Sequence, residues 1–139
     1  HLIQPAGGSR NPTTHETVDA HGQNIHMDGQ DVFKFAARKM PSACKKVMQK
    51  AGLTIDDVAL LVPHQANLRI IENAMTRLKI GREKVWINIA QHGNMSAACI
   101  PVCLTEARDA GRLKKGDNII TVAFGAGLTW AAALLKWSK

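Results

Sequence analysis

The stretch that most constrains this chain is residues 58–70, where an apolar run passes through a polar cluster into a helical pattern. The run at residues 58–62 has the length and composition of a strand buried on both faces. Pro63 cannot donate a hydrogen bond to a neighbouring strand, so it ends the strand and presents His64 at the carboxyl edge. Asn67 is suited to cap the following helix. Open α/β sheets bind their ligands at such an edge.

Two helical patterns flank this first strand. Apolar residues recur at helical spacing over residues 31–51. Pro41 lies inside this span and removes one backbone donor, so we expect a kink, or two abutting helices, near Met40. A second helix is predicted over residues 67–79, with Gly81 as its C-cap residue.

The second half of the chain repeats the order of strand and helix. Residues 85–90 predict a strand, and residues 96–110 predict a helix that follows a polar turn. Residues 118–124 and 128–137 predict two further strands, joined by a tight turn at residues 125–127 into an antiparallel hairpin. The pattern therefore predicts an α/β fold with a mixed sheet covered by helices.

The first thirty residues have a different character. Residues 1–30 are rich in Gly, Pro, Asn, Thr and His and show little periodicity, so we expect an irregular segment that leads into a domain at residues 31–139. His15, His21 and His26 match no common spacing of metal ligands, and no metal site is expected.

The charge and the cysteines narrow the classes of function. Eighteen Lys and Arg against eleven Asp and Glu favour an anionic partner. No nucleic-acid motif is present and aromatic residues are few, so nucleic acid is not expected. Cys44, Cys99 and Cys103 are odd in number, which favours free thiols in a reducing compartment. The chain shows no membrane-spanning run and no signal peptide, so we expect a cytoplasmic protein without a membrane partner.

Polar residues recur at three connections on one edge of the predicted sheet. His64 and Asn94 lie thirty residues apart at the carboxyl ends of successive strands, so they can approach one ligand. The turn at residues 125–127 can reach the same place. A neutral imidazole and a carboxamide donate hydrogen bonds without carrying charge, which suits an enolate or an oxyanion. Helix capping by both residues is an equally good interpretation of the spacing alone.

Three motifs in the right order resemble the carboxyl-terminal half of 3-oxoacyl-[acyl-carrier-protein] synthase III (beta-ketoacyl-ACP synthase III), a thiolase-superfamily enzyme. They read VPHQANLRI, HGNMSAA and FGAGLTW and occupy residues 62–70, 92–98 and 124–130, and residues 7–10 and 27–35 add to the resemblance. The asparagine in the His-Gly-Asn context favours the initiating synthase over relatives with histidine or glutamate at this position. The resemblance implies a thiolase-like fold, of which this chain is one incomplete half.

The resemblance also implies a reaction and roles for single residues. It implies an acyltransferase of fatty acid biosynthesis that joins acyl-CoA to malonyl-ACP in a decarboxylating Claisen condensation. His64 and Asn94 would hold the malonyl thioester carbonyl and stabilise the enolate. The backbone N–H of Ala126 would contribute to the oxyanion hole, although the family usually has glycine there. CoA thioester is a substrate, and no cofactor is implied.

Binding roles follow from the same resemblance. Residues that would line the CoA and pantetheine channel are Gly29, Phe33, Ala66 and Asn67. Residues that would meet the acyl carrier protein are Lys34, Gln65 and Arg69. The complete enzyme is expected to be a homodimer.

The family's nucleophilic cysteine lies in an amino-terminal half that this sequence does not contain. None of the three cysteines occupies the expected strand-to-helix context, so we expect the isolated chain to be inactive and the amino-terminal half of the same enzyme to be its partner. Two alternatives stay open: a CoA-binding or carrier-binding module without catalysis, and a related ketosynthase III-like acyltransferase. A purely structural half-domain would need neither His64 nor Asn94.

Overall fold

A three-stranded mixed sheet forms the centre of the computed structural model, which describes residues 2–139. Its strands are β3 (Leu60–Pro63), β4 (Asn118–Gly125) and β5 (Thr129–Lys136), in the order β3-β4-β5. β3 runs parallel to β4, and β4 runs antiparallel to β5. A short 3₁₀ turn, η3 (Ala126–Leu128), joins the last two strands. The predicted mixed sheet and terminal hairpin are therefore confirmed.

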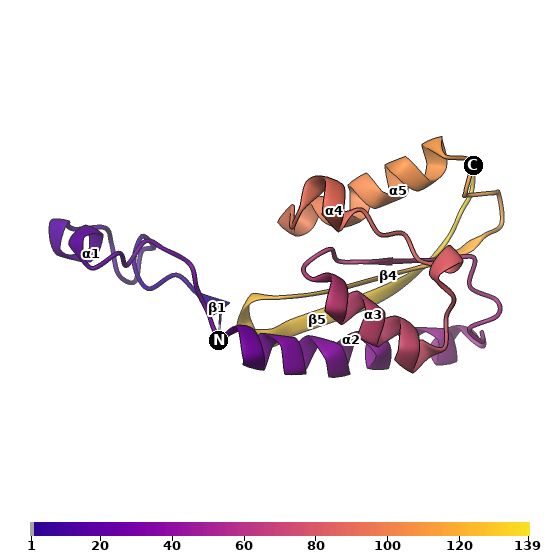
Figure 1. Cartoon of the computed structure of the whole chain (residues 1–139), viewed down its shortest axis with the longest axis horizontal. Helices are drawn as coiled ribbons and strands as arrows, with labels where there is room; N and C mark the ends of the chain where they lie inside the picture. Colours follow the sequence, from indigo (N-terminus) through magenta and orange to yellow (C-terminus); the bar gives the residue numbers. More distant parts are fainter. Residues whose placement is uncertain (1) are drawn as a thin grey trace.

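Helices cover both faces of this sheet (Figure 1). α2 (Gly29–Ala51) and α3 (Leu68–Leu78) lie on one side, and α4 (Ile89–His92) and α5 (Cys99–Asp109) lie on the other. One apolar core fills the space between the sheet and the first pair, and a smaller one lies under α5. The two helical layers place the carboxyl ends of β3 and β4 between them.

α2 runs unbroken through Pro41, so the expectation of two abutting helices is wrong. Asp28 caps its start by accepting a hydrogen bond from the Asp31 N–H at 3.1 Å. Pro41 removes only one backbone donor, and the buried side chains of Met40 and Cys44 on either side of it pack on the same core. Burial of a continuous apolar face thus holds the helix together.

The C-cap of α3 lies two residues earlier than the sequence predicted. Lys79, not Gly81, is the C-cap residue and adopts a left-handed conformation with a φ of 56°. The turn carries Ile80 into the core, where only 6% of it is exposed, and the Ile80 N–H bonds the Met75 carbonyl at 3.1 Å. An apolar contact beyond the helix end therefore sets the position of the cap.

The strand predicted at residues 85–90 is wrong. Val85 forms a single parallel bridge with Leu61, after which the chain enters α4 without joining the sheet. Side chains take the hydrogen bonds that a neighbouring strand would have made. Arg82 donates to the Val85 carbonyl at 2.8 Å, and the side chain of Gln65 bonds the backbone on both sides of residue 87. The segment is preceded by η1 (Arg82–Lys84).

α5 begins beyond another short 3₁₀ turn, η2 (Ser96–Ala98). Pro101 is the third residue of α5, where a missing N–H costs nothing. Ala110 is the C-cap residue of α5, and Gly111, with a left-handed φ of 68°, follows it. Cys99 and Cys103 are fully buried, and Cys103 packs in the same core as Leu60 and Val62 of β3.

The first residues form an arm that extends away from the sheet (Figure 1). β1 (Leu2–Ile3) pairs antiparallel with β2 (His26–Met27) at the base of the arm, and α1 (His15–Asp19) lies within it. Thr14 and Thr17 cap α1 reciprocally. Within residues 2–139, no helix combines the length and the apolar character that spanning a bilayer requires.

Candidate functional site

His64 is held at the carboxyl end of β3 by the sheet itself. Its backbone N–H donates to the Val122 carbonyl at 2.8 Å, so the parallel pairing continues one residue beyond Pro63. The imidazole packs edge-on against Phe124, with ring centroids 5.5 Å apart and planes at 70°. Partial burial lowers the pKa of His64, because desolvation disfavours the imidazolium. A neutral histidine therefore stands at this edge at pH 7.

Asn94 lies on the exposed turn between α4 and η2. Its Oδ1 accepts a hydrogen bond from the Ser96 N–H at 2.9 Å, and Ser96 adopts a left-handed φ of 53°. Within residues 2–139, the Asn94 Nδ2 makes no hydrogen bond. Because the Ser96 N–H holds the amide oxygen, the Nδ2 group of Asn94 is left as a hydrogen-bond donor for a ligand at this turn.

The η3 turn accommodates Ala126 without strain. The left-handed residues of the turn are Gly127, with a φ of 73°, and Leu128, with a φ of 51°, and Ala126 is not among the residues with positive φ. Position 126 therefore does not require glycine. The Thr129 hydroxyl donates to the Ala126 carbonyl at 3.1 Å and fixes the turn.

The described residues bring His64 close to this turn, because Phe124 lies two positions before Ala126. No hydrogen bond joins the side chains of His64 and Asn94 within residues 2–139. Hydrogen bonds of other side chains, among them Gln65 and Glu106, run instead between the two segments that carry His64 and Asn94.

Gln65 begins this connection. Its Nε2 donates to the carbonyls of Pro63 and Trp86, at 2.8 and 3.2 Å, and its Oε1 accepts from the Asn88 N–H at 3.2 Å. The side chain has no exposed surface. The expectation that Gln65 meets a carrier protein is therefore wrong, because its amide is buried and fully used within the fold.

Glu106 of α5 completes the connection. One carboxylate oxygen accepts from the Trp86 indole N–H and from Asn88 Nδ2, both at 2.8 Å, and the other lies 2.6 Å from His92 Nε2. The hydrogen bond from Trp86, together with those from Asn88 and His92, lowers the pKa of Glu106. Glu106 is thus ionised at neutral pH and joins three segments of the chain.

No sequence motif indicates this group, because its members lie 14 to 20 residues from Glu106. The one signal that the sequence offers is the composition of the residues around Glu106. Glu106 is the one carboxylate in an otherwise apolar and small-residue stretch at residues 97–107, a position where an acidic side chain needs donors.

The other predicted binding residues lie at the starts of α2 and α3. Asn67 caps α3 by accepting from the Arg69 N–H at 2.9 Å, and Ala66 is half-buried beside it. The Arg69 guanidinium lies 5.8 Å from the centre of the Phe33 ring, which brings the two helix starts together. A side chain at Gly29 would meet no atom within 4 Å in residues 2–139.

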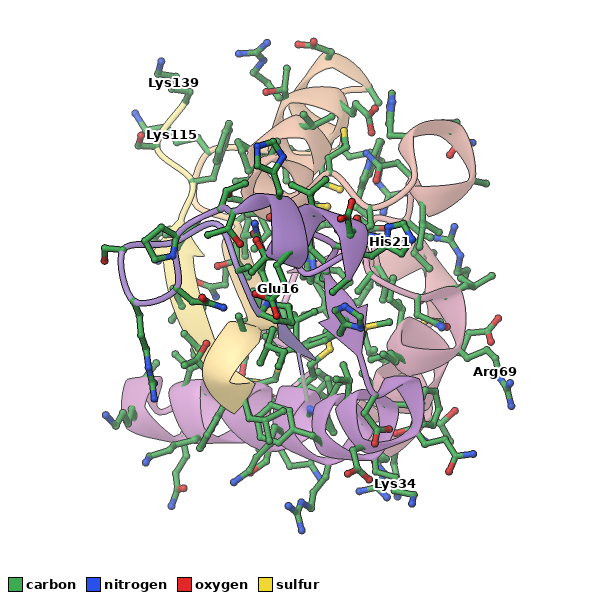
Figure 2. All side chains as sticks on the ribbon, turned by 90° about the vertical axis from the view of Figure 1, so that its left-hand side faces the viewer. Glu16, His21, Lys34, Arg69, Lys115 and Lys139 are labelled. Atoms are coloured by element: carbon green, nitrogen blue, oxygen red, sulfur yellow. The ribbon has the colours of Figure 1, made fainter. Side chains whose placement is uncertain are left out.

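Two cations project from this region into solvent (Figure 2). The side chain of Lys34 is 73% exposed, with Nζ 4.0 Å from the Asp31 carboxylate, and Arg69 is also exposed. A pocket at the start of α2 is lined by Lys34 and Leu128 among others, so it borders the η3 turn.

The three thiols differ from an activated nucleophile. Cys44, Cys99 and Cys103 are free and buried. Burial raises the pKa of Cys44 to about 12, and burial together with the Glu106 charge raises that of Cys103 to about 12. A thiol in this state supplies almost no thiolate at neutral pH.

Comparison with known proteins gives a consistent result. Residues 48–137 match the family model of the 3-oxoacyl-[acyl-carrier-protein (ACP)] synthase III C-terminal domain. The chain is 55% identical over its whole length to the beta-ketoacyl-[acyl-carrier-protein] synthase III of Caldanaerobacter subterraneus subsp. tengcongensis and spans 42% of that protein.

Comparison with solved structures indicates the same family. The synthase III of Thermus thermophilus is 45% identical, with a TM-score of 0.85 over 99% of this chain and 41% of that one. The synthase III of Pseudomonas aeruginosa is 34% identical, with a TM-score of 0.86 over the same shares of the two chains. The thiolase-like fold expected from the sequence motifs is therefore confirmed.

Proposed function

Because the chain belongs to the family of the 3-oxoacyl-[acyl-carrier-protein] synthase III C-terminal domain, we propose that it forms the malonyl-handling part of a condensing enzyme that initiates fatty acid synthesis. The chain spans about 42% of the curated relatives it matches. In the proposed reaction, a cysteine takes an acyl group from acyl-CoA and releases CoA. Malonyl-ACP then loses carbon dioxide, and its enolate carbon attacks the acyl-cysteine to form the new C–C bond and free the cysteine.

Two available donors, His64 at the end of β3 and Asn94 on the turn after α4, are the observation that carries this proposal. Asn94 has its amide oxygen fixed by Ser96, so its Nδ2 is available as a donor. The lowered pKa of His64 keeps its ring neutral, so that one ring nitrogen donates without bringing a full charge. Both would bind the thioester oxygen of the malonyl group, where negative charge grows as carbon dioxide leaves. Donors that are in place before reaction stabilise such a charge without a cost of reorganisation.

The backbone N–H of Ala126 would stabilise the second oxyanion, on the acyl-cysteine carbonyl. The turn is fixed by the Thr129 hydroxyl and is linked to His64 through Phe124. This arrangement supports a role in which the Ala126 N–H donates a hydrogen bond at the edge of the sheet that carries His64.

The nucleophile would come from the remainder of the enzyme. The thiols of this chain are buried, and the pKa values of Cys44 and Cys103 are raised to about 12, so they are poor candidates for acylation. On this basis the isolated chain would not carry out condensation. The partner that completes a Cys-His-Asn site would be the amino-terminal half of the same enzyme.

Substrate binding would use the starts of α2 and α3. The pantetheine channel would be lined by Gly29, Phe33, Ala66 and Asn67, and the open space around Gly29 is compatible with a ligand passing there. Lys34 and Arg69, both exposed, would meet the acidic carrier protein or a phosphate. We further propose that the complete enzyme is a cytoplasmic homodimer, that CoA thioester serves as substrate, and that no cofactor is used.

Substitution of the two donors in the complete enzyme tests the proposal. Asn94→Asp keeps an oxygen for the Ser96 N–H and replaces the donor by an acceptor, and His64→Ala removes the ring. Each should lower the rate of carbon dioxide release by about 100- to 1,000-fold, while acylation of the cysteine by acyl-CoA changes much less.

Acylation serves as the internal control, since it precedes malonyl binding. Unchanged decarboxylation in both variants would show that the two donors have another role. A complete protein that binds acyl-CoA and carrier protein but releases no carbon dioxide would instead be a binding module.

A further inference from the structure

We propose that Glu106 is a positioning residue that sets the orientation of Asn94 through His92. This inference rests on the proposed role of Asn94 as a donor to the malonyl thioester. Glu106 itself would touch neither substrate nor reacting atoms.

The contact between Glu106 and the Asn94 turn is short and direct. His92 is the last residue of α4, and its Nε2 lies 2.6 Å from Glu106 Oε1. Only Gly93, which has a left-handed φ of 66°, separates His92 from Asn94. α4 has only four residues and Gly93 has wide conformational freedom, so the backbone alone holds the turn weakly. The hydrogen bond between His92 and Glu106 supplies the missing constraint.

The other carboxylate oxygen ties this turn to the body of the fold. It accepts from the Trp86 indole and from Asn88 Nδ2, which belong to the segment running beside β3. The backbone N–H of Asn88 in turn donates to Gln65, the residue that follows His64. A continuous series of hydrogen bonds therefore links the neighbour of His64 to the turn that carries Asn94.

The geometry requires a carboxylate at position 106. Three donors from two segments converge on its two oxygens, and an ionised carboxylate can accept all three, whereas a carboxamide has only one acceptor oxygen. Charge-assisted hydrogen bonds are also shorter and stronger than neutral ones, which agrees with the 2.6 Å separation from His92. One hydrogen-bonded network thereby joins Gln65, which follows His64, to His92, which lies two residues before Asn94.

Variants at His92 and Glu106 in the complete enzyme test this role. His92→Ala removes only the contact to the turn and leaves Glu106 bound to Trp86 and Asn88. His92→Gln restores an N–H donor of similar reach. Glu106→Gln keeps the size of the side chain and removes the second acceptor. Asp109→Asn is the matched control, because Asp109 is an exposed carboxylate on the same helix that pairs with Arg108.

A displaced reacting group can cost up to about 100-fold in rate, so His92→Ala and Glu106→Gln should lower kcat for carbon dioxide release by about 10- to 100-fold. The KM for malonyl-ACP and the rate of cysteine acylation should stay within about twofold, since only the positioning of a transition-state donor changes. His92→Gln should recover most of the rate, and Asp109→Asn should behave as the parent enzyme.

A double-mutant cycle separates positioning from general damage. In an Asn94→Asp background, His92→Ala should have little further effect, because the group that it positions has already lost its donor. Equal losses in acylation and decarboxylation, or fully additive effects with Asn94→Asp, would overturn the inference. The proposed function fails separately, if Asn94→Asp itself leaves carbon dioxide release intact.

Discussion

The side-chain oxygen of Gln65 accepts a hydrogen bond from the backbone N–H of Asn88 at 3.2 Å, in the interior of the protein. The same amide donates to the Trp86 carbonyl at 3.2 Å. Gln65 thus pairs with two backbone groups of another segment, as a residue of a neighbouring strand would. One buried side chain replaces part of a strand pairing and holds the segment that leads to α4.

We predict that Gln65→Ala destabilises the protein by about 3–5 kcal/mol, because it leaves buried backbone groups without partners and creates a cavity. Thermal melting of the complete enzyme should show the loss, and amide exchange should accelerate at residues 86–92. Gln49→Ala, on the exposed face of α2, should change stability by less than about 0.5 kcal/mol. Unchanged exchange at Asn88 in the Gln65 variant would contradict the role of this amide.

The sequence predicted the elements whose hydrogen bonds are local or follow a strong pattern. α2, α3 and the β4–β5 hairpin have clear apolar periodicity and were predicted within a few residues. The segment at residues 85–90 has equally strong strand propensity, yet beyond one bridge to Leu61 its partners are the side chains of Arg82 and Gln65. Propensity cannot distinguish a backbone partner from a side-chain partner, so this strand was predicted wrongly.

The residues of the candidate site also separate into those that the sequence indicated and those that only the folded structure reveals. The sequence indicates His64, Asn94 and Ala126 as candidates because each lies in a motif at the end of an element, and their roles stay predictions. Glu106 was not, because its importance depends on three donors that only the folded chain brings together. Gln65 lies inside a motif and was still misinterpreted, since its direction into the core depends on the conformation of the turn after Pro63.

Titration of His64 is the second prediction. Burial places its pKa in the folded protein below the ordinary value of 6.5. As the pH falls, the unfolded chain takes up a proton near 6.5 while the folded protein does so only at lower pH. Between these two values falling pH therefore favours unfolding, and above pH 6.5 the contribution is constant.

NMR titration of the complete enzyme should give a midpoint below 6.5 for the His64 ring, whose signal is identified by its loss in His64→Gln. In melting experiments, the parent should lose stability relative to His64→Gln as the pH is lowered from 6.5 toward that midpoint. A midpoint at or above 6.5 would show that the ring is solvated in the assembled enzyme.

The third prediction concerns thiol reactivity. Iodoacetamide at pH 7.5 should leave Cys44, Cys99 and Cys103 largely unmodified in the folded complete enzyme, because all three are buried. Mass spectrometry of peptides should locate rapid labelling at a cysteine outside this chain. After unfolding in urea, all three should react. Rapid native labelling at any of them would reopen the question of the nucleophile.

The fourth prediction concerns the two exposed cations. Lys34→Glu and Arg69→Glu should each weaken binding of the acyl carrier protein at low salt, and the difference should shrink as salt screens the charges. Lys46→Glu is a suitable control, because it lies on α2 about 18 Å further along the helix axis. Condensation with small substrates should change little. Equal carrier affinity for all three variants at low salt would remove Lys34 and Arg69 from the docking surface.

The parallel pairing of β3 with β4 has a consequence for how the chain reaches its native state. It joins Leu60 to Ile119, residues 59 positions apart. The two strands of the β4–β5 hairpin, by contrast, follow each other in the sequence and are separated only by the η3 turn. Closing a long loop costs entropy before its contacts form, so the hairpin and the helices should form early and β3 should dock late. The edge that carries His64 is then created in the last step, and a ribosome-bound chain would acquire it only after β4 has emerged.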